Sequence, residues 1–379
     1  MRTRLLAAAL VGLVAAAGPA AAGTDRDGPV GGDRLGARDV VVDPGAPKLP
    51  DGLTAASWLV ADLDSGDVLA AKDPHGRYAP ASTLKTLTAL TLIPVLEPDR
   101  KVVPTFDDIN IEGSKVGLVE RVGYPVSELL SALMMVSGND AANVLATAAG
   151  GQQATAALMN DKARSLQAYD TRAVNPHGLD AEGQVSSSYD LALIARAGLA
   201  DPDFARYAAM KRGSVSAPGS ARIEMYTKNK LLKSYEGALG IKNGYTSRAR
   251  ASFVGAAERD GRRLVVTLMK ADPKVADEAV KLLDWGFAAG QVDPVGELVD
   301  PEASVAQEAV EAVEAVVAAT DGGAAESTGL GTTLAGMGLA AAALLAVRHR
   351  PGPRTPPRAP AARPVPVQRP ASPRVPVRR

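Results

Sequence analysis

The sequence contains no cysteine and only three histidines, His75, His177 and His349. The absence of cysteine excludes a thiol nucleophile, a thiolate metal site and disulfide bonds. The histidines show no H-x-x-x-H spacing, so a zinc site or a Ser-His-Asp triad has few residues to draw on. Aromatic residues are scarce at 4%, but apolar residues make up 46% of the chain, which is ample for a large core. Acidic and basic residues balance at 42 each, so the net charge indicates no nucleic-acid partner.

The N-terminal segment is typical of a signal peptide. Arg2 and Arg4 precede an Ala/Leu/Val run, which ends in small residues at an A-x-A site, Ala20-Ala-Ala22. We therefore expect residues 1–22 to be cleaved. Residues 23–50 are rich in Gly, Pro, Asp and Arg without apolar periodicity, and they predict a disordered linker.

The C-terminal part has the composition of a stalk and a membrane anchor. Residues 299–328 are rich in Ala, Val and Glu and then in Gly, Ala and Ser, which predicts a stalk. Residues 329–347 form an uncharged stretch of 19 residues, long enough to span a bilayer as a helix. Its Ala and Gly content leaves a surface helix as the alternative. The basic, acid-free tail 348–379 favours a spanning helix with a disordered Pro/Arg-rich cytoplasmic tail, and hence an anchored protein with an extracellular domain.

Residues 51–298 carry the patterns of one folded domain. Apolar runs at 57–64 and 67–70 flank Ser65-Gly66 and predict a hairpin. A second hairpin is predicted at 251–269, around Glu258-Arg-Asp-Gly261. Helical patterning begins at Ser82 and continues at residues 126–136, 141–148, 155–166, 188–199 and 276–287. Strands at both ends with helices between them predict an α/β (α+β) fold, in which an antiparallel sheet is backed by helices and joined by an all-helical subdomain.

The first candidate for chemistry is the S-x-x-K pattern Ser82-Thr-Leu-Lys85, at the start of a predicted helix after Pro80. Lys85 lies one turn after Ser82 and on the same face. A serine hydroxyl needs an adjacent base, and Lys85 can serve only if burial or a second cation keeps its amine neutral. Lys242 is the candidate for that cation. Taken alone, the pattern favours an ordinary N-cap at Ser82 and a solvated surface lysine at Lys85.

The second candidate is the S-x-N pattern Ser137-Gly-Asn139, between two predicted helices. A turn at this place can direct polar side chains into a cleft. The alternative is simple turn chemistry, because Ser, Gly and Asn are the usual turn residues.

The third candidate is the K-x-G pattern Lys242-Asn-Gly244, followed by Tyr245 and Thr246 at the start of a predicted strand. Gly244 would let a substrate backbone approach closely, and Lys242 would offer a fixed positive charge to a carboxylate. An exposed lysine at a hairpin tip is the alternative. The three patterns occur in this order at spacings of about fifty and about a hundred residues, and together they form a strong joint signal.

Residues 53–287 resemble the low-molecular-weight penicillin-binding proteins of the D-alanyl-D-alanine carboxypeptidase type. Five segments look like family signatures in family order: Arg77–Lys85, Ser137–Ala142, Asn175–Asp180, Thr227–Leu232 and Leu283–Phe287. Two features depart from the family. Asn243 stands where the family usually has threonine. The short predicted stalk after Phe287 leaves no room for the C-terminal β-domain of many members, and we expect a spanning helix in place of their amphipathic anchor.

The resemblance implies a penicillin-binding/β-lactamase-like transpeptidase fold and a serine-type carboxypeptidase that trims peptidoglycan stem peptides ending in D-Ala-D-Ala. β-Lactams are implied as covalent inhibitors, and no metal or cofactor is expected. The implied catalytic residues are Ser82, Lys85, Ser137 and Asn139, and the implied substrate-binding residues are Lys242, Gly244, Tyr245 and Thr246.

In the implied mechanism, Ser82 attacks the peptide carbonyl and Lys85 accepts its proton. The backbone N–H groups of Ser82 and Tyr245 form the oxyanion hole. Ser137 relays a proton to the departing D-alanine, and Asn139 holds Lys85 and the substrate amide. Lys242 and Thr246 bind the terminal carboxylate, and water then releases the acyl-enzyme. His177, in the Asn-Pro-His-Gly turn, is expected to be structural.

Three other functions compete with this interpretation. A β-lactamase of the same fold would often use a glutamate-held water, and no glutamate stands in an E-x-x-N context. A transpeptidase or endopeptidase would share the same motifs. A non-enzymatic wall-binding protein would have no need of intact Ser82, Lys85 and Ser137.

Overall fold

The structure is a computed structural model that describes residues 28–302. The predicted signal peptide, spanning helix and cytoplasmic tail lie outside the described residues, as do residues 23–27 of the linker and 303–328 of the stalk. Within 28–302, every helix is too short or too polar to cross a bilayer.

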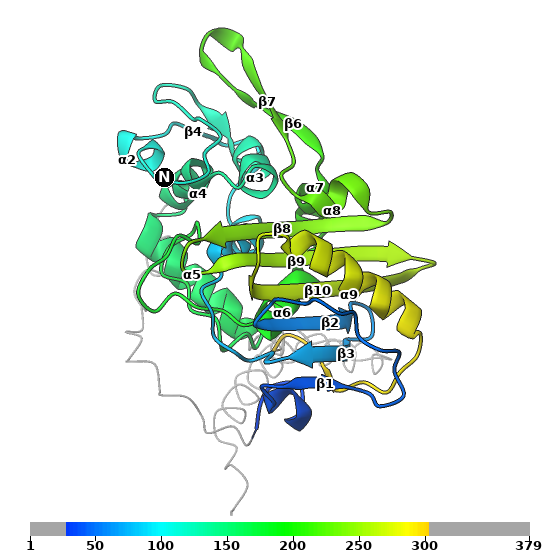
Figure 1. The fold of residues 1–379 in the computed structure, drawn as a ribbon. Helices are drawn as coiled ribbons and strands as arrows, with labels where there is room; N and C mark the ends of the chain where they lie inside the picture. Colours follow the sequence, from blue (N-terminus) through cyan, green and yellow to red (C-terminus); the bar gives the residue numbers. More distant parts are fainter. Residues whose placement is uncertain (1–27, 303–379) are drawn as a thin grey trace, which may run out of the picture. The chain divides into compact units, whose positions relative to one another are not determined.

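A seven-stranded antiparallel sheet forms the middle of the fold (Figure 1). Its strands follow the order β1-β3-β2-β10-β9-β8, and β11 pairs with β3. The strands are β1 (Val40–Val42), β2 (Ser57–Asp62), β3 (Asp67–Lys72), β8 (Ala238–Thr246), β9 (Arg250–Arg259), β10 (Arg262–Ala271) and β11 (Gly296–Glu297). The β2–β3 and β9–β10 hairpins confirm the two hairpins that the sequence predicts.

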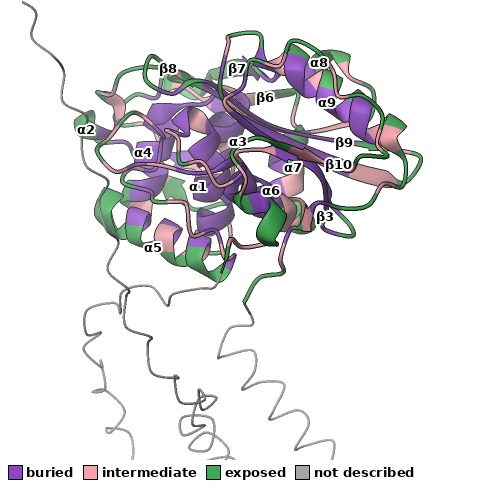
Figure 2. Cartoon of the chain, turned by 60° about the horizontal axis from the view of Figure 1, so that its bottom comes forward, coloured by how far each residue is buried: buried purple, intermediate pink, exposed green. Residues whose placement is uncertain are grey.

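Helices cover both faces of the sheet (Figure 2). This explains why β2 is buried along its whole length. Leu59 and Ala61 of β2 belong to the core on the side of the helical subdomain, whereas Trp58 and Val60 belong to the core under the C-terminal helix α9 (Val275–Ala289). Successive side chains of a strand point to opposite faces. A strand between two helical layers therefore reads as a continuous apolar run.

The helical subdomain carries two of the three sequence patterns. Its elements are η2 (Ala81–Leu84), α1 (Lys85–Leu92), α2 (Phe106–Ile109), α3 (Val126–Met135), α4 (Asn139–Ala148), α5 (Gln152–Ser165), α6 (Ser188–Ala200) and α7 (Pro202–Ala209). Short strands β4 (Lys101–Val102) and β5 (Tyr124–Pro125) pair with each other. A hairpin of β6 (Arg212–Ser216) and β7 (Arg222–Tyr226), with η3 (Pro218–Ser220) at its turn, and helix α8 (Lys230–Ser234) lead back to the sheet. The predicted antiparallel sheet backed by helices with a helical subdomain is confirmed.

The predicted disordered linker at 23–50 is wrong for residues 28–50. Residues Val40–Val42 pair with β3, and Leu35, in the short helix η1 (Asp33–Gly36), is fully buried. The indole of Trp285 donates a hydrogen bond to the carbonyl of Pro47 at 2.9 Å. A strand of three residues is too short to show a period of alternating apolar residues. The Gly- and Pro-rich composition of residues 28–50 therefore gave no sign of their contacts with the domain.

The predicted boundary between domain and stalk at Leu298 also lies too early. The backbone N–H of Val299 donates to the hydroxyl of Tyr189 at 3.2 Å, and the N–H of Glu302 donates to the carbonyl of Ser165 at 2.9 Å. The described part of the predicted stalk, residues 299–302, is therefore held against the domain.

Candidate active site

Ser82 lies in a tight turn that is fixed through one carbonyl group. The carbonyl of Pro80 accepts from the hydroxyl of Thr83 at 2.6 Å and from the hydroxyl of Ser252, on β9, at 2.7 Å. The chain forms a 3₁₀ turn over Ala81–Leu84 before the α-helix begins at Lys85. Ser82 is half-buried in this turn, whereas Lys85 is fully buried.

The amine of Lys85 has three oxygen neighbours. It lies 3.0 Å from the hydroxyl oxygen of Ser82 and 2.7 Å from Oδ1 of Asn139, and it also contacts the carbonyl oxygen of His177. Nδ2 of Asn139 donates to the carbonyl of Glu112 at 2.7 Å, so its Oδ1 is the atom that faces Lys85. Two of the three neighbours can only accept hydrogen bonds. A neutral amine satisfies both with its two N–H groups, and its lone pair then faces Ser82.

The surroundings of Lys85 favour this neutral form. Burial lowers the pKa of its amine well below the ordinary lysine value, and the positive charges of Lys242 and Lys228 lower the pKa further, against the opposing charge of Asp140. The sequence prediction that Lys242 acts on Lys85 as a second cation agrees with this. The position and the lowered pKa of Lys85 are consistent with its predicted role as the base for Ser82, which stays a prediction.

The S-x-N pattern forms the predicted turn, between α3 and α4. Ser137 adopts a left-handed conformation with φ of 63°, and Asn139 begins α4. The hydroxyl of Ser137 is buried without a hydrogen-bond partner among residues 28–302. A buried hydroxyl of this kind is costly unless a ligand or water uses it. Its proton-relay role remains a prediction, and its unused hydrogen-bonding capacity is consistent with that role.

Asp140 organises one wall of the site, which the sequence analysis did not foresee. Its carboxylate accepts from the backbone N–H groups of Val116, Gly117 and Leu118 at 2.9 to 3.2 Å. It therefore fixes the loop that precedes α3 against the first turn of α4. An aspartate directly after Ser-Gly-Asn at a helix start was the available signal, but nothing in the sequence indicated its partners.

Lys242 is buried at the fifth of the nine residues of β8, rather than at the start of a strand as predicted. Its amine donates to the carbonyl of Asn243 at 2.8 Å. Burial lowers the pKa of Lys242 to about 7, with a contribution from the charge of Lys228. Lys242 therefore carries its positive charge up to about neutral pH, and its binding of a substrate carboxylate stays a prediction.

Gly244 allows a close approach within the protein, and the predicted approach of a substrate backbone stays a prediction. A Cβ atom at this position would lie 2.6 Å from the backbone nitrogen of Ser82 and 2.9 Å from that of Thr83. The missing side chain therefore lets β8 lie directly against the turn Ala81–Leu84 that contains Ser82. This brings the segment around Tyr245 next to Ser82, as the predicted oxyanion hole requires, and the Tyr245 side chain is 62% exposed.

Thr246 is the last residue of β8 and connects this strand to the loop that contains His177. Its hydroxyl donates to Oδ1 of Asp180 at 2.9 Å and accepts from the N–H of Ala249 at 2.9 Å. His177 contributes its carbonyl to Lys85, while burial and then the charge of Lys85 lower the pKa of its ring to about 3. The ring is therefore neutral at physiological pH, and its structural role stays a prediction.

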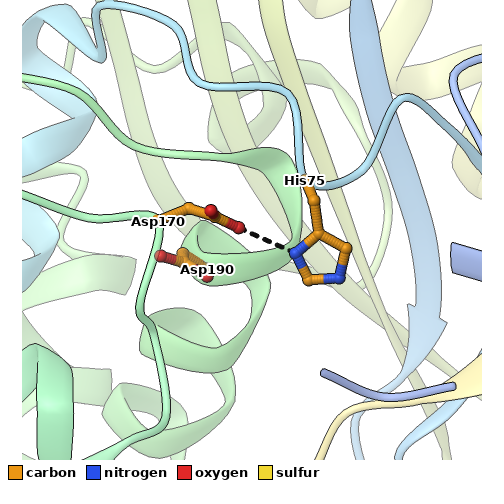
Figure 3. A group of neighbouring side chains, drawn as sticks. All are labelled: His75, Asp170 and Asp190. Carbon is orange, nitrogen blue, oxygen red and sulfur yellow. Dashed lines mark hydrogen bonds and ion pairs between the residues drawn. The ribbon is translucent and has the colours of Figure 1, made fainter. Parts of the chain in front are cut away.

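His75, Asp170 and Asp190 form a second cluster of titratable groups (Figure 3). Nδ1 of His75 lies 2.7 Å from Asp170, and Nε2 lies 3.0 Å from the carbonyl of Val30. Burial opposes protonation of His75, yet the hydrogen bond and charge of Asp170 leave its pKa raised. Both ring nitrogens face oxygen acceptors, which suits an imidazolium paired with Asp170. A protonated imidazole has no free lone pair for a metal ion. We therefore interpret His75 and Asp170 as an ion pair, and the hydrogen bond from His75 to Val30 holds the N-terminal segment in place.

Comparison with known proteins agrees with the geometry of the site. The chain is 42% identical to the D-alanyl-D-alanine carboxypeptidase DacB2 of Mycobacterium tuberculosis, over 69% of this chain and 91% of DacB2. The crystal structure of a D-alanyl-D-alanine carboxypeptidase from M. tuberculosis is 42% identical and matches with a TM-score of 0.65, over 68% of this chain and 99% of that one. A variant of a Streptomyces DD-transpeptidase is 25% identical and matches with a TM-score of 0.60, over 63% of this chain and all of that one. Residues 44–273 match the D-alanyl-D-alanine carboxypeptidase family, and the chain belongs to that family.

Proposed function

We propose that the chain is a serine-type D-alanyl-D-alanine carboxypeptidase that removes the terminal D-alanine from peptidoglycan pentapeptides. Ser82 Oγ attacks the carbonyl carbon between the two D-alanines while Lys85 takes its proton. The C–N bond then breaks, the amine of the departing D-alanine gains a proton through Ser137, and an ester to Ser82 remains. Water hydrolyses this ester and restores the serine. β-Lactams form the same kind of ester and act as covalent inhibitors.

The observation that carries this proposal is the arrangement of Lys85. Its amine lies 3.0 Å from the Ser82 hydroxyl and faces two fixed acceptors, so its one remaining site is a lone pair directed at the nucleophile. A structural lysine would instead be satisfied by acidic partners. The test is to incubate the purified domain with labelled penicillin and with a peptide ending in D-Ala-D-Ala, and to score covalent labelling and release of D-alanine.

The same incubation separates the competing functions. Rapid release of opened penicillin would indicate a β-lactamase, and transfer of the acyl group to an added amine would indicate a transpeptidase. Lasting penicillin label together with free D-alanine supports the carboxypeptidase.

Lys242 tests whether the site recognises a free carboxylate. We expect Lys242→Ala to reduce kcat/KM for the free-acid peptide at least about tenfold more than for its C-terminal amide, because only the acid has a charge to lose. Since the pKa of Lys242 is about 7, its charge is present below that pH and lost above it. KM for the acid should therefore rise between pH 6 and pH 8, whereas KM for the amide should change little.

Asn243→Thr is the control, because it restores the usual family residue on the same strand. Both side chains offer a short hydrogen-bonding group, so we expect kcat/KM to change by less than about tenfold, or roughly 1.4 kcal/mol. Equal losses on acid and amide for Lys242→Ala would show that Lys242 does not bind the carboxylate and would favour a function other than carboxypeptidase.

We further propose that the protein is exported and anchored in the plasma membrane by one helix at residues 329–347. The signal-peptide pattern at residues 1–22 and the basic residues that begin at Arg348 support an extracellular domain and a cytoplasmic tail. Peptidoglycan lies outside the membrane, so this placement also brings the domain to its substrate.

Protease accessibility tests this topology. Protease added to intact cells should remove the domain and leave a tag fused after Arg379 undigested. Digestion of the tag in intact cells would contradict the proposed orientation, and a freely soluble, uncleaved chain would contradict the anchor.

A further inference from the structure

The one proton of the Thr246 hydroxyl is already donated in the absence of substrate. Its single proton is donated to Asp180 at 2.9 Å, and its oxygen accepts from the N–H of Ala249 at 2.9 Å. If Thr246 is to bind the terminal carboxylate of a substrate, this same proton must turn from Asp180 to the substrate. A hydroxyl has only one proton to donate, so the two acceptors exclude each other.

Asp180 is held in position by the loop that carries it. The carbonyl of Leu179, directly before it, accepts from the side-chain amides of Asn175 at 3.0 Å and of Gln184 at 2.6 Å. Oδ1 of Asn175 also accepts from the N–H of Gly178 at 2.8 Å. The backbone on the N-terminal side of Asp180 is therefore tied down twice, and its carboxylate faces Thr246 from a fixed anchor.

The same loop is part of the catalytic arrangement. Two residues before Leu179, the carbonyl of His177 contacts the amine of Lys85. A Cβ atom on Gly178 would lie 2.0 Å from the carbonyl oxygen of Ala81, so this loop also lies against the turn that contains Ser82. The contact between Asp180 and Thr246 therefore joins this same loop to β8.

We propose that Asp180 is a specificity-determining residue, which competes with the terminal carboxylate of the substrate for the hydroxyl of Thr246. This inference rests on the proposed function. A substrate carboxylate bound at Thr246 lies within a few ångströms of the Asp180 carboxylate, and the two like charges repel. Asp180 therefore weakens binding of the free-acid peptide and also of the D-alanine product, which carries the same carboxylate. Peptides without a C-terminal charge escape this competition.

Asp180→Asn tests the proposal, because it keeps the shape of the side chain and an acceptor oxygen but removes the charge. We expect KM for the free-acid peptide to fall about three- to tenfold, with kcat changed less than about twofold and KM for the C-terminal amide unchanged. At about 1 M salt, where the Debye length is about 3 Å, the ratio of the parent KM to the Asp180→Asn KM for the acid should approach one. The control is Glu182→Gln, which removes an exposed acid two residues further along the same loop and should leave both KM values unchanged.

A second comparison tests whether Asp180 acts through the hydroxyl. In a Thr246→Val background, Asp180→Asn should lower KM for the acid by less than half as much as it does in the parent. An unchanged or raised KM for the acid, or an equal fall for acid and amide, would overturn the proposal. Calorimetric binding of both peptides to proteins that also carry Ser82→Ala gives the same comparison without turnover. A failure of the proposed reaction is therefore separated from a failure of the role of Asp180.

Discussion

Replacing Ser82 by alanine should abolish both penicillin labelling and D-alanine release. The hydroxyl of Ser82 lies 3.0 Å from the amine of Lys85, and in the proposed mechanism its oxygen forms the ester. Without it, no acyl-enzyme forms, and we expect turnover to fall by at least about a thousandfold, as for the loss of other serine nucleophiles. Labelled penicillin detected after denaturing electrophoresis measures the ester, and D-alanine release measures turnover.

The fold should survive this change, because Ser82 is only half-buried and alanine fits where serine does. The thermal midpoint of Ser82→Ala should lie within a few degrees of the parent value. Ser234→Ala, at the exposed end of α8, is a matched control that should retain full labelling. Covalent labelling retained in Ser82→Ala would mean that another residue is the nucleophile.

The sequence contained enough information to predict which side chains meet. Lys85 follows Ser82 by three residues, and helical geometry alone places them together. Asn139 and Lys242 lie far from Ser82 along the chain, and only the joint occurrence of three patterns in order connected them. In the structure, Asn139 bonds Lys85 and the charge of Lys242 lowers the pKa of Lys85, so these connections are present.

The sequence did not predict contacts made by the main chain or by single residues of the loops. The carbonyl of His177 contacts Lys85, but any residue type supplies a carbonyl, so no pattern indicates it. In the sequence, Asp180 looks like an ordinary turn residue. Its contact with Thr246 depends on the position of β8, which only the structure shows. Val40–Val42 was missed for a similar reason, because a strand of three residues gains its stability from pairing with β3 and not from its own periodicity.

Replacing Lys85 by arginine should lower the rate of acylation by at least about a hundredfold, or roughly 2.7 kcal/mol of transition-state stabilisation. Arginine keeps a positive charge and an approximate length, but a guanidinium stays protonated at every working pH and has no lone pair to offer. The two carbonyl acceptors at Asn139 and His177 would hold this cation in place and leave Ser82 without a base.

Lys85 is fully buried, so the larger guanidinium also risks disturbing the fold. Lys85→Met is therefore the matched variant, because methionine is close in shape to a neutral lysine. Both variants should acylate slowly while Lys85→Met keeps a thermal midpoint near that of the parent.

The pH dependence of acylation gives a readout that a packing defect cannot mimic. Because burial lowers the pKa of Lys85, the parent should gain acylation rate with rising pH far below the range of an ordinary lysine, and Lys85→Met should lose this rise. Near-normal acylation by both variants, or an unchanged rise in Lys85→Met, would mean that another group accepts the proton of Ser82.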